Sequence, residues 1–162
     1  MTDPKVSILM GSRSDAEVMR AAATILDDFG VGYEMRVLSA HRTPNETIEY
    51  VKGAEDRGIE VLIAGAGFAA HLAGALAANS ILPVIGVPID SSPLKGVDAL
   101  YSTVQMPGGI PVATMTIGKS GAKNAGLFAV QILSRKNPAM VEKLRAYRQK
   151  MREEILATRL EE

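Results

Sequence analysis

Short apolar runs alternate with amphipathic stretches along this chain, and this alternation constrains its fold more than any other feature. Five runs predict strands, over Val6–Met10, Tyr33–Leu38, Val61–Ala64, Val84–Val87 and Val112–Ile117. Because helical patterns follow the strands, the strands are expected to lie parallel in a sheet that helices cover on both faces. The sequence therefore predicts an α/β fold, an open three-layer αβα sandwich of the flavodoxin or Rossmann type.

The helical stretches carry start and stop signals. Ser14, with Glu17 three residues later, predicts a capping box that opens a helix ending at Gly30. Thr43–Glu46 predicts a second helix, with Thr as the cap, Pro at the first helical position and Glu closing the box. This helix is expected to end near Gly58. Two further helices are expected, one ending near Asn79 and one over Lys119–Leu133.

The segment after Asn137 predicts a single long helix. Its twenty-odd residues without a breaker span roughly 35 Å. Apolar residues recur along it only as a narrow stripe, which comprises Met140, Leu144, Tyr147, Met151 and Ile155. Such a helix is expected to pack on something outside its own domain, so we expect a homo-oligomer. Residues 1–162 are expected to form one domain, with a core over 5–135 and a C-terminal helical extension over 137–162.

Composition narrows the classes of function. The 162 residues include 18 Lys+Arg and 18 Asp+Glu, and this balance argues against nucleic acid as the main partner. The sequence has no cysteine, which excludes disulfides, thiolate metal sites and a cysteine nucleophile. Neither a signal-peptide pattern nor an apolar run of about 18 residues is found, so a cytoplasmic protein without a membrane span is expected.

Parallel α/β sheets bind ligands beyond the carboxyl ends of their strands. Four segments follow predicted strands directly: Gly11–Asp15, Ser39–Pro44, Gly65–Gly74 and Pro88–Pro93. In the first, backbone amides and hydroxyls at a helix start suit a phosphate, and Asp15 suits ribose hydroxyls. The alternative is purely structural, with Ser14 as a helix cap and Gly11 in a turn.

The second segment places His41 beside Arg42. Histidine is the side chain best suited to exchange protons near neutral pH, and arginine can hold a phosphate through two hydrogen bonds. The chain has only two histidines, and this one lies where such folds bind ligands. His41 is therefore a candidate acid–base group.

The third segment begins Gly-Ala-Gly-Phe-Ala-Ala over Gly65–Ala70, which fits the dinucleotide fingerprint, with Asp90 at the end of the next strand. This loop, however, follows the third predicted strand rather than the first. Small residues here can equally let the loop and the next helix pack closely, or line a small pocket beside His71. A half-buried structural role for His71 stays open as well.

Four segments together resemble one family. They are GSRSD at Gly11–Asp15, SAHRTP at Ser39–Pro44, the stretch Ala64–Leu72, and QMPGGIPVAT at Gln105–Thr114. Their order and spacing are similar to those of class I 5-(carboxyamino)imidazole ribonucleotide mutases of purine biosynthesis, the PurE type. The resemblance covers residues 5 to 135, and it implies a flavodoxin-like fold, assembled as a homo-octamer with sites shared between subunits.

The resemblance also implies a reaction, the transfer of a carboxylate from the exocyclic nitrogen to carbon 4 of aminoimidazole ribonucleotide. This isomerase reaction needs neither a cofactor nor a metal. His41 matches the acid–base histidine of the family, which reprotonates the nitrogen as carbon dioxide leaves and later removes the proton on carbon 4.

The ligand contacts follow from the same resemblance. Arg42, Ser14 and Ser39 are expected on the phosphate, Asp15 on the ribose, and Ser12 at the same end of the nucleotide. The remaining substrate-binding residues expected, at the base and carbon dioxide pocket and around it, are Ala40, Gly65, Ala66, Gly67, His71 and Leu72.

Three residues depart from the family pattern Gly-Gly-Ala-Ala-His-Leu-Pro-Gly-Met. Phe68 stands at the second Gly, Ala73 at the Pro and Ala75 at the Met. The Phe68 benzyl group is expected either to point away from the cavity or to fill it, and it is costly if φ is positive. Two alternatives stay open: a decarboxylase or carboxylase acting on a related imidazole ribonucleotide, and a non-catalytic nucleotide- or flavin-binding module.

Overall fold

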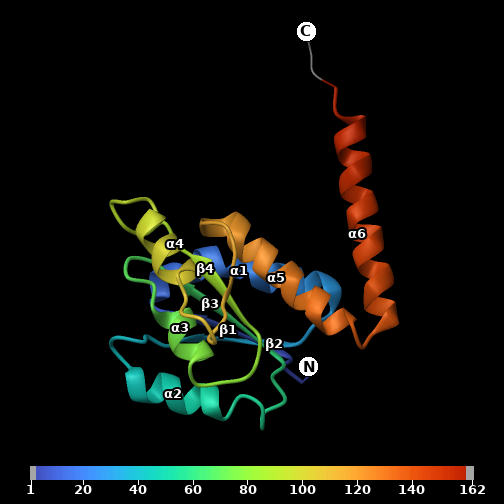
Figure 1. Cartoon of the computed structure of the whole chain (residues 1–162). Coiled ribbons are helices and arrows are strands. Elements are labelled where there is room, and N and C mark those ends of the chain that lie inside the picture. Colours follow the sequence, from blue (N-terminus) through green and yellow to red (C-terminus); the bar gives the residue numbers. More distant parts are fainter. Residues whose placement is uncertain (1–2, 160–162) are drawn as a thin grey trace.

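The computed structural model describes residues 3–159 and has three layers, with helices on both sides of a parallel sheet (Figure 1). The strands are β1 (Val6–Met10), β2 (Tyr33–Val37), β3 (Val61–Ala66), β4 (Val84–Pro88) and β5 (Ala113–Thr114). Their order across the sheet is β2-β1-β3-β4-β5, with every neighbouring pair parallel. This is the flavodoxin-like order, so the structure confirms that fold and excludes the Rossmann order.

The helices divide between the two faces of the sheet. Their bounds are η1 (Arg13–Asp15, a 3-10 turn), α1 (Ala16–Phe29), α2 (Pro44–Lys52), α3 (Leu72–Ala77), α4 (Val97–Val104), α5 (Gly118–Ser134) and α6 (Pro138–Ala157). Helices α1 and α5 pack on one face, while α2, α3 and α4 cover the other (Figure 1).

Burial on both faces explains why the strand signals are continuous apolar runs. In β1, Ile8 points into the core beneath α1 and α5, and its neighbour Leu9 points into the core beneath α2 and α3. Neither side chain is accessible to solvent. The edge strand β2 is partly exposed, because only β1 pairs with it.

Helix α2 is tied to the sheet by a polar cluster around Tyr50. The Tyr50 hydroxyl donates to Glu34 of β2 and accepts from the hydroxyl of Ser7 in β1, at 2.5 Å. The guanidinium of Arg57 lies over the Tyr50 ring, 4.3 Å from its centroid. These contacts fix α2, and with it the loop that leads into its N-terminus.

The predicted start of the first helix was wrong in detail. The capping box forms around the 3-10 turn: Ser12 is the cap, and the Asp15 side chain accepts from the Ser12 amide. Ser14 therefore does not cap α1, which begins at Ala16 and ends as predicted at Gly30, in the left-handed conformation. The reason is that the buried Asp15 side chain turns back and accepts a hydrogen bond from the Ser12 amide, so the capping box closes one turn before α1.

The second helix begins with Pro44 at its first turn, as predicted, but Thr43 makes no side-chain cap bond. The Thr43 hydroxyl bonds Ser39 instead, accepting from its amide at 2.9 Å and donating to its carbonyl at 3.1 Å. Helix α2 ends at Lys52, before the predicted Gly58, because the chain leaves the helix in a series of turns.

Two elements of the second half differ from the sequence pattern. The predicted strand Val112–Ile117 pairs with β4 only over Ala113–Thr114, because it is an edge strand that soon turns into α5. The sequence pattern did not locate α4, whose eight residues start at Val97, after Gly96, which provides no side-chain cap. Its exposed Val97 and Tyr101 blur the expected division into apolar and polar faces.

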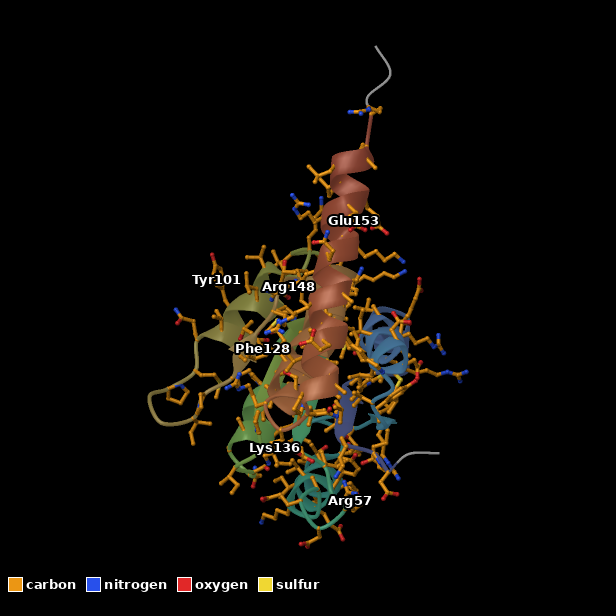
Figure 2. All side chains as sticks on the ribbon, turned by 90° about the vertical axis from the view of Figure 1, so that its right-hand side faces the viewer. Arg57, Tyr101, Phe128, Lys136, Arg148 and Glu153 are labelled. Carbon is orange, nitrogen blue, oxygen red and sulfur yellow. The ribbon has the colours of Figure 1, made fainter. Side chains whose placement is uncertain are left out.

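Helix α6 begins as predicted, with Asn137 accepting from the amide of Met140 at 3.2 Å. Its first half packs on the domain, where the rings of Phe29 and Tyr147 lie 5.8 Å apart. Its second half, around Glu153, extends beyond the domain (Figure 2). Within residues 3–159, no helix combines the length and the apolar character that a membrane crossing requires.

The close approach of α1 and α5 at Gly126 generates a test of this packing. A Cβ added to Gly126 would lie 2.8 Å from the carbonyl oxygen of Ala22 and 3.0 Å from Cβ of Ile25. Gly126→Ala is therefore expected to lower the free energy of unfolding by about 1–3 kcal/mol, measured by urea denaturation. The exposed Lys123→Ala on the same helix is the control, and equal stability of the two variants would contradict the close approach.

Candidate functional site

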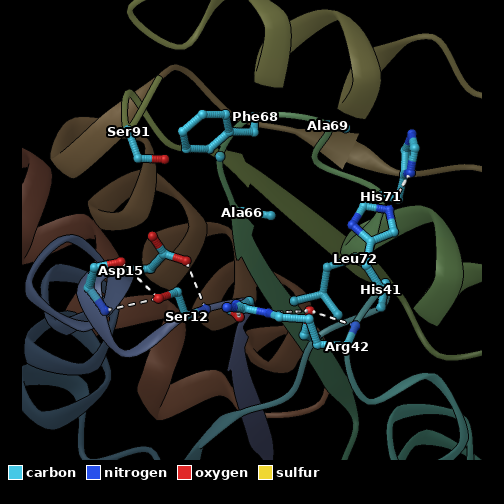
Figure 3. A pocket seen from close by; sticks show the side chains of 15 residues that line it. Ser12, Asp15, His41, Arg42, Ala66, Phe68, Ala69, His71, Leu72 and Ser91 are labelled. Carbon is cyan, nitrogen blue, oxygen red and sulfur yellow. Dashed lines mark hydrogen bonds between the residues drawn. The ribbon is translucent and has the colours of Figure 1, made fainter. Parts of the chain in front are cut away.

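A cavity of about 550 Å³ opens at the carboxyl ends of β1, β2 and β3 (Figure 3). The loops after these strands supply almost all of its wall. Its lining residues are Gly11, Ser12, Ser14, Asp15, Ser39, Ala40, His41, Arg42, Ala66, Gly67, Phe68, Ala69, His71, Leu72 and Ser91. The position agrees with the rule for ligand sites in parallel sheets.

The loop after β1 supplies hydroxyls and one buried carboxylate. The Ser12 hydroxyl accepts from the hydroxyl of Ser14 at 2.9 Å, while the amide of Ser12 donates to Asp15 at 3.0 Å. Asp15 is only 5% exposed. Burial raises the pKa of Asp15, against the opposing effects of the Ser12 hydrogen bond, the positive charge of Arg42 and the Ser14 hydrogen bond.

The loop after β2 places Arg42 across the floor of the cavity. Its guanidinium donates to the carbonyl oxygen of Gly11, and its Nε lies 3.3 Å from the Ser39 hydroxyl. The backbone amide of Arg42 also donates to that hydroxyl, at 3.2 Å. The arginine thus joins the loops after β1 and β2, and its positive charge lies beside Ser12 and Asp15 (Figure 3).

His41 and His71 meet at the opposite side of the cavity. Nε2 of His41 lies 2.7 Å from Nδ1 of His71, and the two rings are nearly perpendicular, with centroids 4.8 Å apart. Both side chains are exposed at the cavity. Such a hydrogen bond needs one nitrogen with a proton and one without, so the pair can carry one extra proton and still keep its bond.

Small residues and one aromatic ring form the wall after β3. A Cβ on Gly67 would overlap the hydroxyl of Ser91, so this glycine allows the loops after β3 and β4 to touch. Phe68 has a φ of 53°, and its ring lies on the same side of the cavity as Ser91 (Figure 3). Left-handed backbone costs a residue with a side chain about 1–2 kcal/mol. The conformational cost that was expected for Phe68 at a positive φ is therefore present.

The residues expected from the sequence converge on this cavity, with one exception. Gly65 does not line it: the residue is buried within β3, where an added Cβ would overlap the side chain of Met19. Its small size serves packing between the sheet and α1. His71, for which a structural role was open, lies at the cavity wall.

The cavity also contains residues that were not among the predicted contacts, namely Gly11, Phe68, Ala69 and Ser91. Ser91 lies in Pro88–Pro93, one of the four segments after strands, but nothing in the sequence distinguishes it from its serine neighbour. In the part of the chain that the structure describes, no three His, Cys, Asp or Glu side chains come together as metal ligands.

Comparison with known proteins gives consistent matches. The model of the AIR carboxylase family (AIRC) matches residues 5–154. The N5-carboxyaminoimidazole ribonucleotide mutase of Thermotoga maritima is 55% identical over 161 residues, which cover 98% of this chain and 93% of that protein. The Pyrococcus abyssi protein of the same name is 61% identical over 149 residues, which cover 92% of this chain and 84% of that protein. The crystal structure of Treponema denticola PurE superposes with a TM-score of 0.85 at 32% identity, covering 94% of each chain.

The buried Asp15 generates a pH-dependent test. Its pKa is raised in the folded protein, so the stability linked to this group is fully present below the unfolded pKa and is lost as pH rises through the folded one. In Asp15→Asn the side chain stays neutral and can still accept from the Ser12 amide. The melting temperature of this variant relative to the wild type is therefore expected to rise from about pH 3 to about pH 7.

The control for this test is Asp28→Asn, an exposed position on α1. Melting curves of both variants and the wild type at the two pH values are compared. A stability difference for Asp15→Asn that stays constant or falls toward neutral pH would contradict the role of burial.

Proposed function

The chain belongs to the AIR carboxylase family, and we propose that His41 moves the protons of its reaction. The activity is that of an N5-carboxyaminoimidazole ribonucleotide mutase of purine biosynthesis, an isomerase. Relatives at 53–61% identity over nearly the whole chain support this activity rather than a separate decarboxylase or a flavin-binding module.

The reaction is balanced in protons. When the carbamate carbon–nitrogen bond breaks, carbon dioxide leaves and the nitrogen takes up one proton. Carbon 4 then attacks the carbon dioxide, and the proton on that carbon must be removed to restore the aromatic ring. One imidazole that donates and then accepts a proton serves both steps.

The hydrogen bond between His41 and His71 is the observation that carries this role. Because Nε2 of His41 is engaged with His71, its Nδ1 is the nitrogen left for the substrate. His71 holds the His41 ring in place through this hydrogen bond. Its Nδ1 can also exchange a proton with Nε2 of His41. We therefore assign His41 to the transfer itself and His71 to positioning.

The opposite side of the cavity suits the sugar and phosphate. We assign Arg42, Ser14 and Ser39 to the phosphate, because the Arg42 guanidinium lies within hydrogen-bond reach of the Ser39 hydroxyl and the Ser14 hydroxyl lines the same cavity. Asp15 is assigned to the ribose hydroxyls and Ser12 to the same end of the nucleotide. This leaves Ala40, Ala66, Gly67 and Leu72 against the base.

His41→Asn tests the catalytic assignment. The variant is expected to lose about 10²–10⁴-fold in turnover of N5-carboxyaminoimidazole ribonucleotide, while retaining affinity for the nucleotide. Turnover is followed by the absorbance of the product, and affinity by calorimetry with aminoimidazole ribonucleotide.

His71→Asn is the matched control, because the same replacement is made at the other ring of the pair. It removes the partner of His41 but not the transferring imidazole, so a smaller loss of turnover is expected. Near-normal turnover by His41→Asn would remove the proposed mechanism, and a larger loss in His71→Asn would exchange the two roles.

We also propose that the enzyme assembles as a homo-oligomer, an octamer as the sequence resemblance implies. The projecting half of α6 supports this: Met151, Ile155 and Leu156 are exposed there, with Ile155 75% accessible. A helix that carries such residues away from its own domain gains stability by burying them against another copy.

Light scattering tests this assembly. The wild type is expected to elute with the mass of an oligomer at micromolar concentration, and Ile155→Glu is expected to shift it toward smaller species by placing a charge in the buried contact. Glu154→Gln, on the adjacent position of the same helix, is the control. A wild-type monomer would contradict the proposal.

A further inference from the structure

We propose that the phenyl ring of Phe68 is an apolar cover on the Ser91 side of the cavity, which slows the exchange of carbon dioxide between the cavity and solvent. The inference rests on the proposed function, because the cover acts on the carbon dioxide that this reaction releases inside the site.

The position of the ring is the first support. Phe68 directly follows Gly67 after β3, lines the cavity and is 55% exposed, so part of the ring faces the cavity and part faces solvent. Figure 3 shows it at the rim, on the same side as Ser91. A ring in this position borders both the cavity and solvent.

The loop that carries the ring is anchored on both sides. Before it, Gly67 lies so close to Ser91 that an added Cβ would overlap the serine hydroxyl. After it, the amide of Ala70 donates to the Ser102 hydroxyl of α4 at 3.1 Å, and the Ala70 side chain is buried. The backbone therefore holds Phe68 at the rim even though its φ of 53° is unfavourable for a residue with a side chain.

The rest of this wall is made of small residues. Ala66, Gly67 and Ala69 line the cavity beside Phe68, so the benzyl group supplies most of the side-chain bulk here. Carbon dioxide is uncharged, and no ion pair can hold it as Arg42 can hold a phosphate. Its retention depends on how well the apolar wall closes the site.

The reaction provides a direct measure of that closure. The carbamate carbon–nitrogen bond breaks, the nitrogen takes a proton, and carbon dioxide is free until the bond to carbon 4 forms and the proton of that carbon leaves. If carbon dioxide escapes in this interval, the product is aminoimidazole ribonucleotide. If dissolved carbon dioxide enters, its carbon appears in the carboxylate on carbon 4.

The test variant is Phe68→Gly, which removes the benzyl group from the rim. Two further variants serve as its controls. Lys95 is the other residue with a side chain and a positive φ among residues 3–159, at 52°, and it does not line the cavity. Lys95→Gly therefore relieves the same backbone conformation without changing the wall. Phe68→Leu keeps apolar bulk at the rim. Melting curves of all three establish that they are folded.

The experiment is a single turnover with the enzyme in excess over N5-carboxyaminoimidazole ribonucleotide, in buffer equilibrated with ¹³C-labelled carbon dioxide. Mass spectrometry measures the ¹³C content of the carboxylated product and the amount of free aminoimidazole ribonucleotide. A reaction without enzyme measures the spontaneous loss of carbon dioxide.

We expect Phe68→Gly to raise both the ¹³C content of the carboxylated product and the amount of free aminoimidazole ribonucleotide about fivefold or more. Lys95→Gly is expected to match the wild type in both quantities. Phe68→Leu is expected to stay nearer to the wild type than Phe68→Gly. Equal labelling in Phe68→Gly and the wild type would overturn the inference, and so would an equal rise in both glycine variants. A wild type that forms no carboxylated product would remove the proposed function and this inference with it.

Discussion

The register of β1 between its two neighbours is the constraint on which the site depends. Met10, the last residue of β1, lies opposite Val37 of β2 and Gly65 of β3. The three loops that follow therefore leave the sheet at the same level, and their side chains meet although they are far apart in the sequence. The apolar core on both faces fixes this register, because a shift by one residue would exchange the two faces of each strand.

The cavity that results separates two kinds of chemistry. Arg42, Asp15 and the serine hydroxyls gather on one side, where a charged sugar phosphate can be held. The histidine pair stands across from them, beside small apolar residues that a planar ring can pack against. In the proposed mechanism, anchoring the nucleotide on the Arg42 side leaves the imidazole of His41 free to exchange protons with the base.

Most of this arrangement was predictable from the sequence, because strand runs and their following loops are local signals. The segments containing Ser12, His41 and Ala66 were identified as cavity loops for that reason. The exceptions depend on three-dimensional contacts: Gly65 is small because Met19 packs against it, Ser91 reaches the cavity through its contact with Gly67, and Ser12 rather than Ser14 forms the capping box because Asp15 is buried. Helix α4 lacks a cap and an apolar face that is wholly buried, so no local pattern marked it.

A crystal structure of the enzyme with a bound aminoimidazole ribonucleotide gives the most direct measurement. The imidazole of His41 is expected within about 3 Å of the exocyclic nitrogen or carbon 4, or joined to either by a single water molecule. The phosphate is expected at the opposite end, on Arg42. A ribonucleotide whose ring lies beyond the reach of His41, even through one water, would contradict the proton-transfer role on which this mechanism depends.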